Sequence, residues 1–425
     1  MKITIHRGTD EIGGSCMEIS TDKTRILVDI GERLEPVDKS SRITRNTDSK
    51  ILPDSLKKSL KSDPPISAVL ISHAHRDHFG LLSLLPTSIP VYMSEGSEIM
   101  LDIAQYFRQV SKVSQEIIPF KLNIEFRDPI HEFDVGDITI IPFLADHSAM
   151  DACSFLFTDG TNRIFYSGDI RAHGRKKIMF DRLVKDPPLA IDALILEGTT
   201  LGRSHDIYSS ELNLENKFTD LFRKTNDLIL VSCSSQNIDR LVTLYRACLK
   251  SGKTLVIDPY TAWILEKVHV LHDTVPNWNS PNMAVFYTEN NYTELLEKDG
   301  HLHMFDTSEI KIRDLLNDRN KIVMKMNFKN GLILRKLKLL RNATLIWSQW
   351  KEYFRKDEPF WAREGIFPEY LHASGHAYKK DLQKLAHAMN PTCIIPIHTQ
   401  HKADYPEIFS PVPVKIVEDG ETMEL

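Results

Sequence analysis

The feature that most constrains this chain is a dense set of potential metal ligands that directly follows a short apolar segment. Residues 68–72 read AVLIS, which predicts a buried strand, and the chain then runs HAHRDH from His73 to His78. His73 and His75 point to the same side of an extended segment, because side chains alternate along a strand. Asp77 and His78 fall in the following turn and can reach a neighbouring point. Imidazole and carboxylate ligands together suit zinc or a similar divalent ion, so the sequence predicts one or two adjacent metal sites here.

Three further residues can complete such a centre. His147, Asp169 and His398 each follow an apolar segment that predicts a strand. A sheet delivers the residues at its strand ends to a common edge, where ligands often bind. We therefore expect these three side chains to join the 73–78 cluster.

Composition and charge exclude several classes of protein. The chain has 425 residues, which predicts two or three domains, and no apolar run reaches the ~18 residues of a membrane span. Its N-terminus has no apolar core typical of a signal peptide. Five widely spaced cysteines without a CxxC pair argue against a disulfide framework and favour the reducing cytoplasm. At a net charge of −5, binding of nucleic acid would need a local basic face.

The order of predicted elements indicates one domain interrupted by an insert. Short strands dominate the beginning of the chain and return near its end, where we expect them at 393–397, around 414–417 and around 422–425. In between, the apolar segments 228–232 and 254–258 each precede a helical stretch, which is the pattern of a parallel α/β unit. We assign residues 1–203 and 351–425 to a discontinuous domain and residues 204–350 to an inserted α/β domain.

These motifs together resemble the metallo-β-lactamase superfamily: HxHxDH, a later His, an Asp in a Gly-Asp step, and a last His at a strand end. The resemblance implies an α/β fold, a four-layer αββα sandwich with two divalent ions at one edge. It also implies the ligands: His73, His75, His147 and Asp169 for one ion, and Asp77, His78, Asp169 and His398 for the other.

Within that superfamily, the insert and three further motifs resemble the β-CASP nucleases. These motifs are Glu197 in LILEGTT, His376 in HASGHA, and the final His398; the SGHA step and the opening TDEIGGSCMEI are most like RNase J. The segment 204–350 would then be a β-CASP domain. Two features depart from RNase J. The last motif reads PIHTQH instead of PVHGE, and the chain stops soon after VEDGETMEL, so we expect the C-terminal domain of RNase J to be missing.

The resemblance implies a ribonuclease that hydrolyses phosphodiester bonds of single-stranded RNA, as an endonuclease, a 5′-exonuclease or both. Two ions, zinc or alternatively manganese, would hold a bridging hydroxide that attacks phosphorus. Catalytic roles would fall to Asp77, to His376 as a phosphate contact or general acid, and to Glu197 as a group that orients a ligand or polarises water. The substrate contacts would be His372, Ser374, Gly375 and His376.

Three regions could carry the RNA. Residues 321–341 hold seven Lys or Arg residues and no acid, which predicts either a phosphate-binding face or the solvated face of an amphipathic helix. A second candidate lies just past Asp169 and consists of Arg171, Arg175, Lys176 and Lys177. Ser234, Gln236 and Arg240 resemble a phosphate-contacting position of RNase J.

Other functions remain open at this point. A DNA nuclease of the same family is one, and faster cleavage of DNA than of RNA would favour it. A small-molecule hydrolase such as a lactonase is another, although the insert and His376 argue against it. A catalytically inactive binding subunit is a third, although no metal-ligand motif is lost. The oligomeric state is also open.

Overall fold

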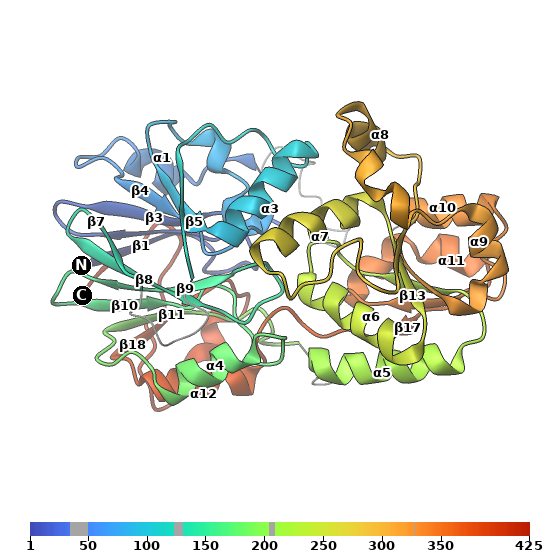
Figure 1. Cartoon of the computed structure of the whole chain (residues 1–425). Helices are drawn as coiled ribbons and strands as arrows, with labels where there is room; N and C mark the ends of the chain where they lie inside the picture. Colours follow the sequence, from blue (N-terminus) through green and yellow to red (C-terminus); the bar gives the residue numbers. More distant parts are fainter. Residues whose placement is uncertain (35–49, 123–130, 204–208, 327) are drawn as a thin grey trace. The chain divides into compact units, whose positions relative to one another are not determined.

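The computed structural model describes residues 1–34, 50–122, 131–203, 209–326 and 328–425, which form two compact units (Figure 1). The first unit comprises Met1–Ile207 and Gly375–Leu425, and the second comprises Tyr208–Ser374.

The first unit is built on two sheets. Their strand orders are β19-β1-β2-β3-β4-β5-β6 and β18-β11-β10-β9-β8-β7. The strands of the first sheet are β1 (Lys2–Arg7), β2 (Cys16–Ser20), β3 (Arg25–Ile30), β4 (Ala68–Leu70), β5 (Val91–Ser94), β6 (Ile117–Phe120) and β19 (Thr422–Glu424). Those of the second are β7 (Phe133–Val135), β8 (Ile138–Leu144), β9 (Cys153–Thr158), β10 (Arg163–Tyr166), β11 (Ala193–Glu197) and β18 (Cys393–Ile397).

Apolar side chains from both sheets fill the space between them. Ile5 and Val28 of the first sheet share one buried cluster with Phe155, Tyr166 and Ile395 of the second. Strands such as β4, β11 and β18 read as nearly continuous apolar runs because their other faces are covered too. This double burial explains why the sequence pattern locates them.

Helices cover the two outer faces (Figure 1). Phe79 and Leu101 pack on the outer face of the first sheet, and Phe180 and Leu382 pack on that of the second. The helices of this unit are α1 (Asp54–Ser59), α2 (Arg76–Phe79), α3 (Glu95–Tyr106), α4 (Lys177–Lys185), α12 (Lys379–Met389) and α13 (Tyr405–Ile408). The predicted four-layer αββα sandwich is therefore confirmed.

The second unit is a parallel sheet in the order β14-β13-β15-β12-β16-β17. Its strands are β12 (Ile229–Ser232), β13 (Thr254–Ile257), β14 (Met283–Val285), β15 (Ile322–Met326), β16 (Thr344–Trp347) and β17 (Glu369–Tyr370). Its helices are α5 (Glu211–Lys224), α6 (Ile238–Ser251), α7 (Pro259–Leu271), α8 (Asn291–Lys298), α9 (Ile312–Asn317), α10 (Phe328–Lys336) and α11 (Glu358–Arg363). No helix in the described ranges is long and apolar enough to cross a membrane.

Three features differ from the sequence-based expectations. Residues 351–374 group with the second unit and not with the flanking segments, because β17 pairs with β16 and Trp361 lies in the core of that unit. Residues 414–417 do not form a strand, since only Val414 makes a single bridge, to Ile394. The stretch 321–341 is not one basic face, because Lys325 is buried on β15 beside Ser235, Asp258 and Thr261.

Candidate metal centre

Strand ends of the first unit deliver the predicted site residues to one place. His73 follows β4, His147 follows β8, Asp169 follows β10 and His398 follows β18. Strands β10, β11 and β18 are parallel neighbours, so their carboxyl ends share an edge. Glu197, the last residue of β11, lies at this same edge.

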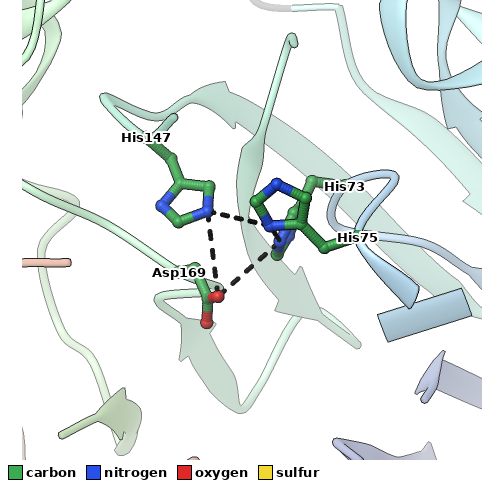
Figure 2. Close-up of side chains that lie close together, drawn as sticks. All are labelled: His73, His75, His147 and Asp169. Atoms are coloured by element: carbon green, nitrogen blue, oxygen red, sulfur yellow. Dashed lines mark hydrogen bonds and ion pairs between the residues drawn. The ribbon is translucent and has the colours of Figure 1, made fainter. Parts of the chain in front are cut away.

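One group of side chains consists of His73, His75, His147 and Asp169, which point toward one another in Figure 2. One ligand atom of each lies within 4.8 Å of those of the others. Asp169 Oδ2 is 3.6 Å from His73 Nε2 and 3.9 Å from His147 Nε2. His75 Nδ1 is 3.0 Å from His73 Nε2.

A second group, Asp77, His78 and His398, lies beside the first. Asp77 Oδ2 is 3.9 Å from both His78 Nε2 and His398 Nε2. Asp169 faces this group as well, with Oδ2 at 3.2 Å from His78 Nε2 and Oδ1 at 3.7 Å from His398 Nδ1. The Asp169 carboxylate therefore lies where it can serve both groups.

Two buried polar atoms of this centre suggest that a cation belongs here. Within the described residues, His78 Nε2 and Asp169 Oδ1 have no hydrogen-bond partner. Buried polar atoms nearly always have a partner, because leaving one unsatisfied costs about 1–3 kcal/mol. A donor set of imidazoles and carboxylates fits a divalent cation such as zinc.

Hydrogen bonds fix how two of the imidazole rings are turned. His147 Nδ1 donates to the carbonyl oxygen of Gly375 at 2.6 Å, and His78 Nδ1 donates to Asp29 Oδ2 at 2.8 Å. Each donation keeps the proton on Nδ1 and leaves the lone pair of Nε2 for a metal ion. Asp29 has a φ of +57° and also accepts hydrogen bonds from Ser72 N and Tyr166 Oη.

Packing of the 73–78 turn depends on a glycine. Gly31 contacts the main chain of Asp77 so closely that a Cβ there would overlap the Asp77 carbonyl group. This glycine follows Asp29 by two residues, so the end of β3 supports the ligand turn through both positions.

Electrostatics favours the ligating form of most of the histidines. Burial lowers the pKa of His73, His75, His147 and His398, which keeps these rings neutral at neutral pH. A neutral imidazole is the form that binds a metal ion.

In two members of the centre, neighbouring charges outweigh the effect of burial on the pKa. Burial would lower the pKa of His78, but the carboxylates of Asp169 and Asp29 raise it well above the usual range. Burial would raise the pKa of Asp169, but His398 and His78 hold it well below its usual value. Asp169 is therefore ionised, as a ligand carboxylate must be.

His376 and Glu197 form a pair at the border of the cluster. His376 Nδ1 lies 2.9 Å from Glu197 Oε2 and 3.8 Å from Asp169 Oδ2. Burial lowers the pKa of His376, but the Glu197 and Asp169 carboxylates outweigh burial and raise it. Glu197 Oε1 accepts a hydrogen bond from the Ile170 main chain, so the carboxylate connects His376 to the segment that carries Asp169.

The predicted substrate contacts do not all lie in this unit. Gly375 does, and its carbonyl group serves His147. A Cβ on Gly375 would lie 2.9 Å from Ser148 Oγ, which explains the glycine. His372 and Ser374 belong to the second unit, where Ser374 is buried and His372 Nδ1 lies 3.3 Å from the Ser348 carbonyl oxygen.

One expectation taken from the resemblance is wrong. Arg240 does not present its guanidinium group to a phosphate, because the side chain is fully buried against Glu211 and donates to the Ser348 carbonyl oxygen. The positive charge at this position is already neutralised inside the second unit.

The sequence did not identify several residues that support the centre. Asp29 stood out only as the polar end of an apolar strand, in VDIG. Ser15, whose Oγ lies 2.8 Å from His398 Nδ1, carried no signal. Asp146 carried no signal either. Arg171 indicated only a phosphate contact, whereas the fold buries it against Asp146.

Comparisons with known proteins agree with this geometry. Residues 24–216 match the model of a beta-lactamase superfamily domain, and residues 369–405 match that of a Zn-dependent metallo-hydrolase RNA specificity domain. A protein of unknown function from Enterococcus faecalis V583 has the same fold, with a TM-score of 0.77, 21% identity and coverage of 100% of this chain and 99% of that chain.

Curated relatives are 23–28% identical to this chain in sequence. Ribonuclease J of Helicobacter pylori is 23% identical, over 100% of this chain and 61% of the relative. The probable RNase MJ4 of Methanocaldococcus jannaschii is 28% identical, over 52% of this chain and 51% of its own. A transcription termination factor, FttA of Cenarchaeum symbiosum, is 24% identical, over 65% and 44%. The chain thus spans about half to three-fifths of the length of these relatives.

The sandwich fold, the order of the His and Asp motifs and both domain matches agree. The chain thus carries a beta-lactamase superfamily domain and a Zn-dependent metallo-hydrolase RNA specificity domain, and its relatives include proteins named as ribonucleases, in agreement with its resemblance to the β-CASP nucleases.

Proposed function

We propose that this protein is a metal-dependent ribonuclease that hydrolyses phosphodiester bonds of single-stranded RNA. The observation that carries the proposal is the pair of ligand groups that share Asp169, with the His376–Glu197 pair beside them. The match to an RNA specificity domain over residues 369–405 includes both His376 and His398, and relatives named as ribonucleases support the same activity.

The ligand groups would hold two divalent ions, zinc first and manganese as the alternative. One ion would take His73, His75, His147 and Asp169, and the other would take Asp77, His78, His398 and the shared Asp169. When bound, such ions supply Lewis-acid chemistry, because they lower the pKa of a water molecule and neutralise charge on the phosphate.

The chain's own residues would position the substrate and move a proton. His376 Nδ1 is held by Glu197, and the other ring nitrogen, Nε2, would face a phosphate oxygen or the leaving oxygen. A protonated His376 would donate a hydrogen bond there as a general acid, and the Glu197 carboxylate would stabilise that protonated form. Asp77 would act as a ligand that also faces the reacting phosphate. The 372–376 segment would contribute further substrate contacts.

The proposal is tested with the purified full-length chain and single-stranded RNA carrying a 5′-monophosphate or a 5′-triphosphate, with DNA of the same sequence alongside. Zinc or manganese is supplied, and products are separated at nucleotide resolution, so that the ladder distinguishes endonuclease from 5′-exonuclease action. His376→Ala should slow RNA cleavage by about 10²–10⁴-fold, the usual contribution of a general acid.

His387→Ala is the matched control, because His387 is an exposed histidine on α12 of the same unit. It should cleave RNA at the wild-type rate. Faster cleavage of DNA than of RNA would instead assign the protein to the DNA nucleases of the family. Turnover of a lactone without cleavage of any nucleic acid would assign it to the small-molecule hydrolases.

A further inference from the structure

A buried ion pair joins two segments that carry candidate metal ligands. Asp146 precedes His147, and Arg171 follows Asp169 by two residues. Both side chains are almost completely buried, at 1% and 0% exposure, and Arg171 Nε lies 3.3 Å from Asp146 Oδ1.

Main-chain hydrogen bonds join the same two segments. Arg171 N donates to the Asp146 carbonyl oxygen at 2.6 Å, and Gly174 N donates to Asp146 Oδ2 at 2.7 Å. A side chain at Gly174 would collide with Asp146 and Arg171, so the glycine permits the close approach. The segment after β8 and the segment after β10 are therefore fastened together immediately beside His147 and Asp169.

Stability alone does not account for this arrangement. Desolvation of two charges costs about as much as their attraction returns, so a buried ion pair often stabilises a fold no better than apolar side chains of the same size would. A fixed relation between two ligand-bearing segments is a benefit that apolar side chains do not provide, because hydrogen bonds define direction as well as distance.

We propose that Asp146 and Arg171 act as positioning residues, forming a clamp that holds His147 at a fixed place relative to Asp169 and so tunes one of the two ions selectively. This inference rests on the proposed two-ion centre. His147 belongs only to the group with His73 and His75, whereas the group of Asp77, His78 and His398 is supported by Asp29 and Ser15. Loosening the clamp should therefore lower the affinity for the ion held by His73, His75, His147 and Asp169, and it should change the affinity for the other ion only slightly.

The test is metal binding by the full-length chain, and it does not depend on catalysis. Protein stripped with a chelator is titrated with zinc in a calorimeter and with cobalt, whose visible spectrum reports the ligand environment. Asp146→Asn removes the charge at nearly constant size, and Arg171→Lys keeps the charge but loses the planar guanidinium group. His147→Ala identifies which ion occupies the first group.

We expect each clamp variant to lower the affinity for one ion by about 10–100-fold, which is the usual effect of removing a group that supports a metal ligand. The ion whose affinity falls should be the one that His147→Ala no longer binds. The affinity for the other ion should stay within about threefold of the wild-type value. Arg25→Lys is the matched control, because Arg25 forms another buried ion pair, with Glu18, in the same unit. It should destabilise the metal-free chain but leave both affinities unchanged.

The results separate the clamp from the proposed function. Equal weakening of both ions, or no weakening in either variant, would overturn the clamp. Binding of fewer than two ions by the wild type would overturn both the clamp and the two-ion proposal. The clamp would be upheld if the wild type binds two ions and the variants have a lower affinity for only one of them. That result would stand even if the protein does not cleave RNA.

Discussion

At the scale of single residues, the geometry of the candidate metal centre depends on which ring nitrogen of His78 and of His147 faces the other ligands. His78 and His147 each donate a hydrogen bond from Nδ1 to a fixed acceptor, and the Nε2 atom of each ring faces Asp169. A ring held in this way needs no reorientation when a cation arrives, so less entropy is lost on binding. The acceptors, Asp29 and the Gly375 carbonyl group, are thus as important for the geometry as the ligands themselves.

This reasoning predicts the effect of Asp29→Asn. The amide cannot accept from His78 Nδ1 as strongly as the carboxylate does, and it can turn a donor toward that nitrogen, so affinity for one ion should fall by about 10–100-fold. Competition with a coloured zinc chelator measures the change. Asp258→Asn provides the comparison, since Asp258 is a buried helix cap in the second unit, and it should not change metal affinity. An unaltered affinity in Asp29→Asn would show that the ring holds its orientation without the charge.

The candidate ligands could be proposed from the sequence because each follows an apolar run, and a run of four or five apolar residues is a local signal. Their supporting residues could not. Ser15 reaches His398, and Asp29 reaches His78 and Tyr166, only through pairings that bring distant parts of the chain together. For Arg240 the sequence suggested a phosphate contact that the fold does not allow. Nothing in its local sequence shows that the side chain is buried and neutralised by Glu211.

At the scale of elements, β2 and β3 share a buried charge. Glu18 of β2 accepts from Arg25 Nε of β3 at 2.8 Å, and Arg25 Nη1 continues to the Pro64 carbonyl oxygen at 2.7 Å. The two strands and the segment that follows α1 are thereby tied to one carboxylate. Burial would raise the pKa of Glu18, but hydrogen bonds from His6, Arg25 and Ser59 lower it to about 2.

This depressed pKa predicts how the stability of the first unit depends on pH. A carboxylate with a lower pKa in the folded state contributes its full stability above its unfolded pKa, near 4.5 for Glu18. That contribution, of the order of 3 kcal/mol, should be lost as the pH falls from about 4.5 to about 2. Chemical unfolding of metal-free protein at a series of pH values measures it. Glu18→Gln should be less stable at pH 6 and should lack this part of the acid dependence; an identical acid profile in the variant would contradict the assignment.

Elements were predictable where burial on both faces makes a strand continuously apolar, as in β4 and β18. The same rule fails at the edges. The segment 414–417 reads as a strand but makes only one bridge, between Val414 and Ile394. Lys325 reads as surface charge, yet it lies on the interior strand β15, where Asp258 offsets its ammonium group.

At the scale of the whole molecule, both groups of candidate ligands lie in one of the two compact units. The second unit has its own parallel sheet and its own core, which includes Leu230, Met324 and Trp361. Its stability should therefore be independent of metal, whereas the first unit should gain stability from any ion it binds.

Removal of metal should consequently affect the chain unevenly. A ligand present at 100 times its dissociation constant stabilises the folded state by about 2.7 kcal/mol. Adding a chelator should speed hydrogen–deuterium exchange in peptides from β4, β10 and β18 but not in those from β12, β13 and β15. Added zinc should restore the slow exchange. A uniform increase across both units would show that the metal does not act through the first unit.

Domain boundaries were the least predictable feature at this scale. Residues 351–374 lack the regular pattern of the insert, and only the pairing of β17 and the burial of Trp361 join them to the second unit. Sequence composition cannot reveal a boundary that depends on the pairing of a two-residue strand and on the burial of one Trp side chain.

The position of His398 has a consequence for the newly made chain. Strand β18, which carries this residue, pairs with β11, although the entire second unit is synthesised between them. While a ribosome is still translating that unit, the emerging protein has His73, His75, His147 and Asp169 but lacks His376 and His398. The proposed nuclease therefore cannot assemble its full centre beside the messenger that encodes it until His376 and His398, which follow the second unit, have been synthesised.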